Sequence, residues 1–469
     1  MKKNSTYIFL LLFVIACGTK KSTEQDNAAT PVDSIVSTAA IVPDSFKQGE
    51  ILPNILCKND PSKSFALYLP NTQAPNTPRP IIFFFDAHGD PTLPLTKYKK
   101  LADEFNFILI GSYNSKNGND WNTTSQIWST LFVDASQRIK FDQKRIYTAG
   151  FSGGAKVASY IALNNSNIAG VIANSAGFPE TQQQAPSGNF NFIGMAGTGD
   201  MNMTELVTLN QQLDQSTIKH QLLMFAGKHE WCPLETMHDA FTWFEFNAVK
   251  DSTAVFNKKI RDDFMALHDK KIDRLKKENN LLALADENKL MVNYLNQGIS
   301  DLAGKYAEAM IEIKKSPVYQ KQLADYNSLL EREKNVKSNL ASALQQNPDE
   351  AFWKSTINDL NKQANAKNAD GAMYKRVISY LSLASYSFSN RALNTGDNET
   401  AAKYISLYKI IDPTNSEAYY FAAMLNARAK NFDAAKAELQ KAVANGFNDW
   451  ERMKAQQEFA GMNLDGIEK

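Results

Sequence analysis

The chain has 469 residues, of which 43% are hydrophobic and 22% are charged. This length accommodates two or three domains with separate cores, and the composition is that of an ordinary globular protein. The 51 basic and 50 acidic residues leave a formal net charge of +1. Because nucleic-acid binding requires a basic face, this balance argues against a nucleic-acid partner.

The N-terminal segment 1–17 has the organisation of an export signal. Lys2 and Lys3 form a positive region, and Tyr7–Ala16 is an apolar run. This run is shorter than the ~20 residues that a transmembrane helix needs. It ends in VIACG, which resembles the bacterial lipobox, where the cysteine becomes an acylated N-terminus. The resemblance implies that Cys17 carries palmitate-type chains and anchors the protein in the bacterial cell envelope, at the periplasmic or outer-membrane face. The alternative is an ordinary secretory signal with an incidental cysteine.

Residues 18–45 are polar and rich in Ser, Thr and Ala, and they lack a helical period. This composition predicts a flexible tether between the anchor and the first domain. No later apolar run is long enough to cross a bilayer, so we expect everything beyond the anchor to be soluble.

Two further cysteines, Cys57 and Cys232, fall early and late in the region that follows the tether. In an exported protein they could form a disulfide that closes a long loop. They could equally be two buried free thiols, because the sequence does not show the distance between their Cα atoms.

Residues 46–250 alternate short apolar runs with amphipathic segments, a pattern that predicts an α/β layered fold with right-handed crossovers. The expected strands cover residues 64–70, 80–88, 107–113, 145–152, 170–177, 191–200 and 220–227. The expected helices between them cover residues 95–105, 125–139, 154–165 and 204–215.

Beyond residue 250 the strand-like runs stop, and apolar residues recur at spacings of three and four amid many charges. This period predicts helices throughout the second half. We therefore expect a domain boundary near residue 250, a helical connector over residues 251–345 and helical repeats over residues 346–469.

Residues 412–446 fit a helix–turn–helix repeat of roughly 34 residues. Ala435, Leu439 and Ala442 form a small–large–small stripe in the second helix, and such residues let paired helices approach closely. The pattern resembles the tetratricopeptide family over about residues 382–447. A plain helical bundle with alanine-rich contacts is the alternative.

The pentapeptide Gly150-Phe151-Ser152-Gly153-Gly154 fits the Gly-x-Ser-x-Gly pattern. It lies between an expected strand and an expected helix, as a nucleophile elbow requires. The turn is tight, so we expect side chains at Gly150 and Gly154 to collide with neighbouring backbone. Ser152 would then be exposed at the carboxyl edge of the sheet, beside a helix N-terminus that favours negative charge. The alternative is a turn with a purely structural role.

A serine nucleophile needs a base, and the base needs an acid that orients it. In this architecture the chain order is Ser, then Asp or Glu, then His. Asp200 and His229 follow Ser152 in that order, each at the end of an expected strand. Glu205 is the alternative acid, and Asp200 could also be a simple turn residue.

An oxyanion hole needs two backbone N–H groups that face the developing alkoxide, and losing one costs roughly a hundredfold in rate. Gly153, after the nucleophile, supplies one of them. His88-Gly89-Asp90 follows an early expected strand, and we expect the main chain of Gly89 or Asp90 to supply the other. The aromatic candidates for lining a pocket, each of which could instead be a core residue, are Trp121, Trp128 and Trp231.

Residues 46–250 resemble the α/β-hydrolase superfamily, and especially the esterases related to polyhydroxybutyrate depolymerases and dienelactone hydrolases. The segments that carry the resemblance are DAHGD, RIYTAGFSGGA, GTGDMN and GKHEWCP. It implies a mainly parallel sheet flanked by helices and an acyl-enzyme mechanism. In that mechanism Ser152 is the nucleophile, His229 its base and Asp200 the acid. The phenylalanine-rich IIFFF strand departs from the family's usual pattern.

We therefore expect an exported, lipid-anchored serine hydrolase that cleaves small or polymeric carboxylic esters without a metal or another cofactor. Its helical half would bind a protein partner or orient the catalytic domain. One alternative is a non-catalytic envelope scaffold that binds partners through its repeats. Another is a serine peptidase with the same triad, which is disfavoured because no β-propeller precedes the domain.

Overall fold

The computed structural model of the protein describes residues 44–71, 78–180, 186–296, 298–346 and 349–467. The expected export signal, the acylation site Cys17 and nearly all of the expected tether lie outside these residues. The chain forms two compact units, which in the described part are residues 44–328 and 329–467. The first unit holds all the strands of the described chain, and the second is helical.

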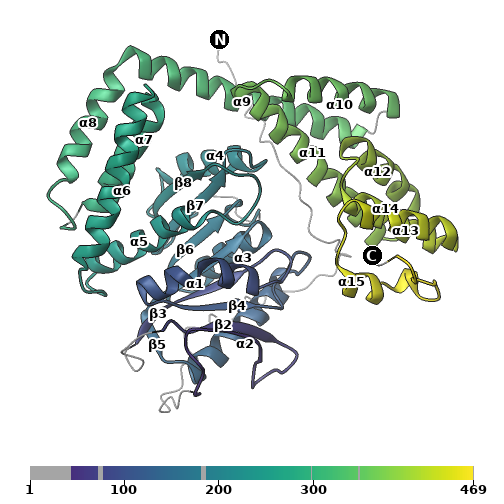
Figure 1. Ribbon diagram of the computed structural model, residues 1–469, viewed down its shortest axis with the longest axis horizontal. Helices are drawn as coiled ribbons and strands as arrows, with labels where there is room; N and C mark the ends of the chain where they lie inside the picture. Colours follow the sequence, from purple (N-terminus) through teal and green to yellow (C-terminus); the bar gives the residue numbers. More distant parts are fainter. Residues whose placement is uncertain (1–43, 72–77, 181–185, 297, 347–348, 468–469) are drawn as a thin grey trace, which may run out of the picture. The chain divides into compact units, whose positions relative to one another are not determined.

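The first unit contains one eight-stranded sheet with the order β1-β2-β4-β3-β5-β6-β7-β8 (Figure 1). The strands are β1 (Ile51–Leu56), β2 (Ser64–Tyr68), β3 (Arg79–Phe85), β4 (Ile108–Ser112), β5 (Phe141–Phe151), β6 (Ile168–Asn174), β7 (Asn191–Gly197) and β8 (Lys219–Phe225). β2 pairs in antiparallel fashion with β1 and β4, and the other pairs are parallel. The α/β class is confirmed, with the mainly parallel sheet that the resemblance to α/β-hydrolases implied.

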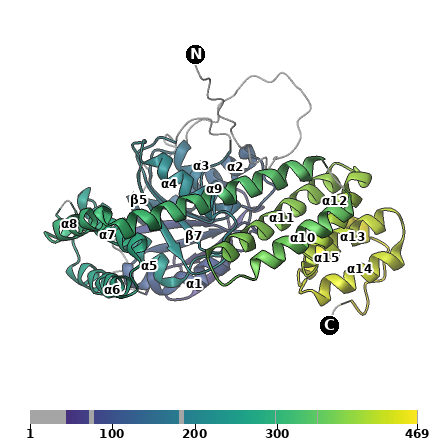
Figure 2. The same cartoon turned by 90° about the horizontal axis from the view of Figure 1, so that it is seen from above.

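Helices cover both faces of this sheet (Figures 1 and 2). α1 (Thr92–Phe105) and α5 (Leu234–Lys250) pack on one face. α2 (Trp121–Arg138), α3 (Gly153–Asn164) and α4 (Met203–Leu213) pack on the other. Because the strands from β3 to β8 are parallel, their carboxyl ends meet at one edge, where such folds bind ligands.

The apolar runs form strands because helices bury both faces of the sheet. Phe83, Phe84 and Phe85 of β3 are all fully buried. Phe83 and Phe85 contact Trp128 of α2, whereas Phe84 stacks on Tyr98 of α1. The phenylalanine-rich strand therefore contributes to the cores on both sides of the sheet.

β1 is an edge strand that the sequence pattern does not reveal. Pro53 lacks an N–H for the ladder, and the register against β2 shifts between Leu52 and Ile55. Asn54, inside the shift, has a left-handed φ of 52°. The irregularity removes the strict alternation that marks a strand, and an edge position tolerates the proline.

Helices beyond residue 250 belong to the same compact unit as the sheet. They are α6 (Lys258–Lys277), α7 (Leu281–Leu295) and α8 (Ala303–Lys315). Phe264 and Tyr294 join the core of α1 and α5, and their rings stack with centroids 4.7 Å apart. The change in sequence character near residue 250 thus marks where strands stop, whereas the unit extends to Ser328. The connector that we expected over residues 251–345 is divided between the two units.

His268 is buried where α5, α6 and α7 meet, and both its ring nitrogens face carboxylates. Nδ1 contacts Glu287, which also pairs with Lys271, and Nε2 lies 3.1 Å from Asp239 Oδ1. Burial alone would lower the pKa of His268, but hydrogen bonds to the two carboxylates outweigh it and raise the pKa to about 9. His268 is therefore a charged link between three helices at neutral pH.

We expect His268→Gln to reduce the stability of this unit in a pH-dependent way. The folded pKa, about 9, lies above the unfolded value of 6.5. The stabilisation is therefore complete below the unfolded pKa and is lost as pH rises through the folded pKa. The substitution should cost about 2–3 kcal/mol near neutral pH and much less at about pH 10. Urea unfolding of both proteins at the two pH values measures this difference, and an equal cost at both would contradict it.

The second unit is a stack of helices. They are the end of α9 (Pro317–Gln346), which begins in the first unit, α10 (Glu350–Ala364), α11 (Ala369–Asn394), α12 (Asn398–Ile411), α13 (Ser416–Arg428), α14 (Phe432–Ala444), α15 (Trp450–Ala455) and the 3-10 helix η2 (Gln457–Phe459). α11 packs on α12 and α13 packs on α14. Ala435, Leu439 and Ala442 are fully buried in the core of this unit. The expected helices and their buried stripe are confirmed, whereas membership of the tetratricopeptide family stays a proposal.

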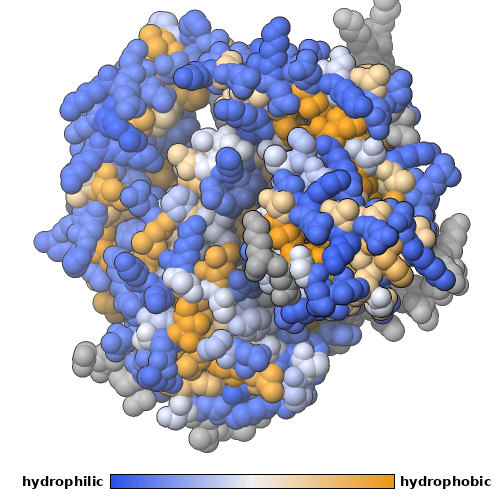
Figure 3. Space-filling model, turned by 45° about the vertical axis from the view of Figure 1, so that its right-hand side comes forward, coloured by the Kyte–Doolittle hydropathy of each residue, from blue (hydrophilic) through white to orange (hydrophobic). Residues whose placement is uncertain are grey.

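Within the described ranges, no helix combines the length and the apolar character needed to cross a membrane. The face of the molecule seen in Figure 3 is mainly hydrophilic, with apolar residues in smaller groups. Single exposed apolar side chains, such as Phe352 and Phe432 in the second unit, are ordinary on a protein surface.

Candidate active site

Ser152 lies in a strained turn between β5 and α3. Its φ of 55° and ψ of −120° fall outside the backbone regions that residues other than glycine favour. Its N–H donates to the carbonyl of Asn174 at 2.9 Å, and its own carbonyl accepts the N–H of Ala155 at 3.0 Å. Backbone bonds on both sides thus stabilise a conformation that the serine would otherwise avoid.

The glycines around Ser152 are there because the backbone is crowded. A Cβ at Gly150 would lie 2.0 Å from the carbonyl oxygen of Gly154, and a Cβ at Gly154 would lie 1.9 Å from that of Phe85. The collisions predicted for these two positions are confirmed. Gly153 differs, since a Cβ there would meet the side chain of Asn117.

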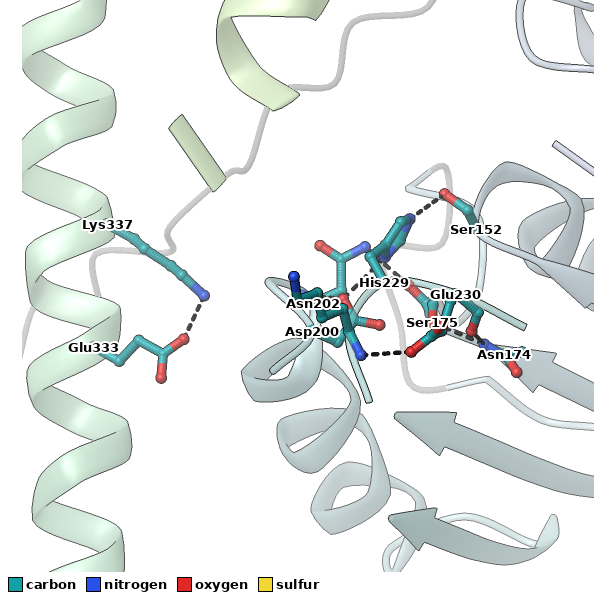
Figure 4. A network of polar contacts seen from close by, with 10 residues as sticks. Ser152, Asn174, Ser175, Asp200, Asn202, His229, Glu230, Glu333 and Lys337 are labelled. Atoms are coloured by element: carbon teal, nitrogen blue, oxygen red, sulfur yellow. Dashed lines mark hydrogen bonds and ion pairs between the residues drawn. The ribbon is translucent and has the colours of Figure 1, made fainter. Parts of the chain in front are cut away.

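The structure brings Ser152, His229 and Asp200 together at the carboxyl edge of the sheet (Figure 4). His229 Nε2 lies 2.9 Å from Ser152 Oγ, and His229 Nδ1 lies 2.9 Å from Asp200 Oδ1. A carboxylate only accepts hydrogen bonds, so Nδ1 carries the proton and Nε2 accepts the serine hydroxyl. The three side chains come from the loops after β5, β8 and β7.

Asp200, rather than Glu205, is the acid that contacts His229. Asp200 is fully buried, and its Oδ1 also accepts the N–H of Asn202 at 2.8 Å. Glu205 lies on α4, where burial raises its pKa and the charge of Lys156 opposes the shift. The acid lies in the loop after β7 and is held in its turn by the backbone N–H of Asn202.

The candidate oxyanion donors differ in what their N–H groups already bind. Gly89, with a φ of 76°, donates to the carbonyl of Asp86 at 3.1 Å, so its N–H is occupied. The N–H groups of Gly153 and Asp90 donate to no backbone carbonyl of the described residues. Of the two alternatives, Asp90 is therefore the candidate partner of Gly153, and Gly89 shapes the turn.

Asp86 lies beside the candidate triad and was not predicted from the sequence. Its Oδ2 accepts Trp231 Nε1 at 2.8 Å, and its Oδ1 accepts the N–H of His88 at 2.8 Å. Burial would raise the pKa of Asp86, but hydrogen bonds from the side chain of His88, from Trp231 and from the N–H of His88 outweigh it and lower the pKa. Asp86 thereby connects the loop after β3 with the loop that carries His229. An aspartate directly after the apolar run of β3 was the available signal.

The tryptophan candidates have different surroundings. Trp128 and Trp231 are buried in the cores on opposite faces of the sheet. Trp121 is half-buried at the start of α2 and stacks on Tyr160 with ring centroids 4.6 Å apart. Trp121 is therefore the one of the three that remains a candidate for contact with substrate.

Cys57 and Cys232 are free thiols, which settles the alternative left open by the sequence. They belong to the cores on opposite faces of the sheet. Burial raises the pKa of Cys57 to about 11 and that of Cys232 to about 12. Neither thiol is thus a nucleophile at neutral pH. Among the residues described, no group of three or more His, Cys, Asp or Glu could hold a metal ion.

No family model matches the chain, and no curated protein matches it. It is similar to the solved structure of S-formylglutathione hydrolase from Staphylococcus aureus, with 14% identity, 42% of this chain and 98% of that chain covered, and a TM-score of 0.34. It is also similar to the feruloyl esterase module from Clostridium thermocellum, with 13% identity, 42% of this chain and 87% of that chain covered, and a TM-score of 0.32. A third similar structure is an esterase from Pyrobaculum calidifontis, with 10% identity, 41% of this chain and 81% of that chain covered, and a TM-score of 0.33. These structures are hydrolases and esterases by name, but identities this low say nothing about the substrate of this chain.

Proposed function

We propose that this protein is a serine hydrolase that cleaves carboxylic esters through an acyl-enzyme on Ser152. One observation carries the proposal: Ser152 Oγ, His229 and Asp200 form a continuous hydrogen-bonded series with two distances of 2.9 Å. A turn with a purely structural role could explain the strained serine. It would not require a histidine bonded to that serine and a buried carboxylate bonded to the histidine.

In the first half of the reaction, His229 Nε2 takes the proton of Ser152 as Oγ attacks the carbonyl carbon of the ester. The carbonyl oxygen becomes an oxyanion, which the N–H groups of Gly153 and Asp90 would stabilise. The ester C–O bond then breaks, and the imidazolium gives its proton to the departing alcohol.

In the second half, His229 removes a proton from water, and the hydroxide attacks the acyl carbon. Collapse of this second intermediate releases the carboxylic acid and returns the proton to Ser152. Asp200 keeps the proton on Nδ1 and stabilises the imidazolium in both halves, and being fully buried it does so away from water.

Turnover of p-nitrophenyl esters of short acids, compared with aminoacyl p-nitroanilides, tests the substrate class. An ester hydrolase turns over the esters and leaves the anilides largely intact. Faster cleavage of the anilides would instead indicate a peptidase. No turnover of either, with a correctly folded protein, would favour the scaffold alternative.

We also propose that the protein is exported and anchored through an acylated Cys17, and that the second unit binds a protein partner. The lipobox-like VIACG supports the acylated anchor. The paired helices with the buried small–large–small stripe support the binding of a protein partner. Labelling of growing cells with radioactive palmitate tests the anchor. Cys17→Ala should remove the label, and a label that persists in this variant would rule out acylation at Cys17.

A further inference from the structure

Asn174 is the last residue of β6 and lies beside the nucleophile turn. It pairs in the parallel register with Phe151, the residue before Ser152, and it is fully buried. Its backbone carbonyl accepts the N–H of Ser152 at 2.9 Å. One of the bonds that hold the strained serine in place therefore comes from Asn174.

The side chain of Asn174 is bonded to the loop that carries His229 (Figure 4). Nδ2 donates to the carbonyl of Glu230 at 2.9 Å, and Oδ1 accepts the N–H of Cys232 at 2.8 Å. The two bonds begin one residue after His229, and they pair one carbonyl and one N–H group of the loop backbone. Only an amide side chain offers neutral donors and an acceptor in one plane, so it fits this position as no apolar residue would.

The same network continues to the acid. Asn174 Nδ2 also donates to Ser175 Oγ at 2.8 Å, and Ser175 has a left-handed φ of 65°. The carbonyl of Ser175 accepts Asn202 Nδ2 at 2.9 Å, and the N–H of Asn202 donates to Asp200 Oδ1 at 2.8 Å. Asn174 and Ser175 thus contact all three loops that supply the candidate triad.

We propose that Asn174 is a positioning residue that holds the loop of His229 at hydrogen-bonding distance from Ser152. The inference rests on the proposed function and adds the residue that aligns base and nucleophile. Asn174 bonds the loop backbone on one side and the backbone of Ser152 on the other. Its side chain bonds none of the three triad side chains. Loss of its side chain should therefore slow the chemical step and leave substrate binding nearly unchanged.

The decisive variant is Asn174→Leu, which keeps the approximate volume and removes both loop bonds. We expect kcat to fall about 100-fold with little change in KM, since a displacement of about 1 Å has this effect. Hydrogen exchange of the backbone over residues 227–232 should become faster. The matched control is Asn165→Leu. Asn165 is also buried, donates to the carbonyl of Ile161 and accepts Trp128 Nε1, and it lies at the far end of α3. This control should keep the kcat of its folded fraction and normal exchange over residues 227–232.

A second variant keeps the inference testable if the leucine protein does not fold. Asn174→Asp preserves the shape and the acceptor for Cys232 but places a carboxylate oxygen against the carbonyl of Glu230 in place of the donor, so it should also lower kcat. A folded variant with wild-type kcat and unchanged exchange would overturn the inference. If the wild-type protein hydrolyses no ester, the proposed function fails. Exchange over residues 227–232 then still decides whether Asn174 holds the loop.

Discussion

Asp200→Asn should lower kcat by about 10³- to 10⁴-fold with little change in KM. Asp200 is buried and lies 2.9 Å from His229 Nδ1. An amide at this position can donate its own N–H to Nδ1, which moves the histidine proton to Nε2. Nε2 then has no lone pair to accept the proton of Ser152, and the imidazolium loses its counter-charge. Steady-state kinetics on a p-nitrophenyl ester measures the change.

A second aspartate–histidine pair provides the control for this substitution. Asp214 Oδ1 lies 3.2 Å from His220 Nε2 outside the candidate site, and the carboxylate is partly exposed. Asp214→Asn removes one carboxylate charge next to a histidine, as Asp200→Asn does. Because this pair lies outside the candidate site, the substitution should leave kcat unchanged. Wild-type kcat in a folded Asp200→Asn protein would show that Asp200 has no part in the reaction.

Gly154→Ala should destabilise the first unit severely, by about 4 kcal/mol or more. The added Cβ would lie 1.9 Å from the carbonyl oxygen of Phe85, and backbone atoms have no rotamer with which to move away. Either β3 or the first turn of α3 must shift, and Ser152 precedes that turn directly. Urea unfolding followed by intrinsic fluorescence measures the loss, and the soluble fraction on expression should fall with it.

Gly304→Ala is the matched control with the opposite expected sign. Gly304 is the second residue of α8, and a Cβ there would have no neighbour within 4 Å. The backbone of Gly304 has no positive φ, and alanine in the unfolded chain has less conformational entropy to lose than glycine, an effect of roughly 0.4–1 kcal/mol, so this variant should be slightly more stable than the wild type. Equal stability of the two variants would contradict the steric explanation of the elbow glycines.

Much of the first unit is predictable because its elements are marked by local sequence. Buried parallel strands appear as continuous apolar runs, and Gly150 is needed because its Cβ would meet Gly154, a contact within the elbow itself. The order Ser152, Asp200, His229 is also local information, since each residue lies in the segment that comes after a strand. Parallel strands that share one edge then bring the three side chains together.

Other features depend on contacts between distant parts of the chain and leave no local pattern. β1 loses its alternation to Pro53 and the register shift. Asn174 looks like any asparagine that ends a strand, and its bonds to Glu230 and Cys232 span more than 50 residues of sequence. The division near Ser328 also could not be predicted from the sequence. The period of the apolar residues identifies the helices after residue 250, but it does not show that they pack against α5.

The most direct test of the central claim is covalent labelling with a fluorophosphonate, followed by mass analysis of the labelled peptide. The proposed mechanism predicts one adduct, located on Ser152, because only a serine activated by a histidine attacks this phosphorus centre at a useful rate. Ser152→Ala should remove the adduct completely, and Asp200→Asn should slow its formation. A wild-type protein that takes up no label, or a label that persists in Ser152→Ala, would contradict the account.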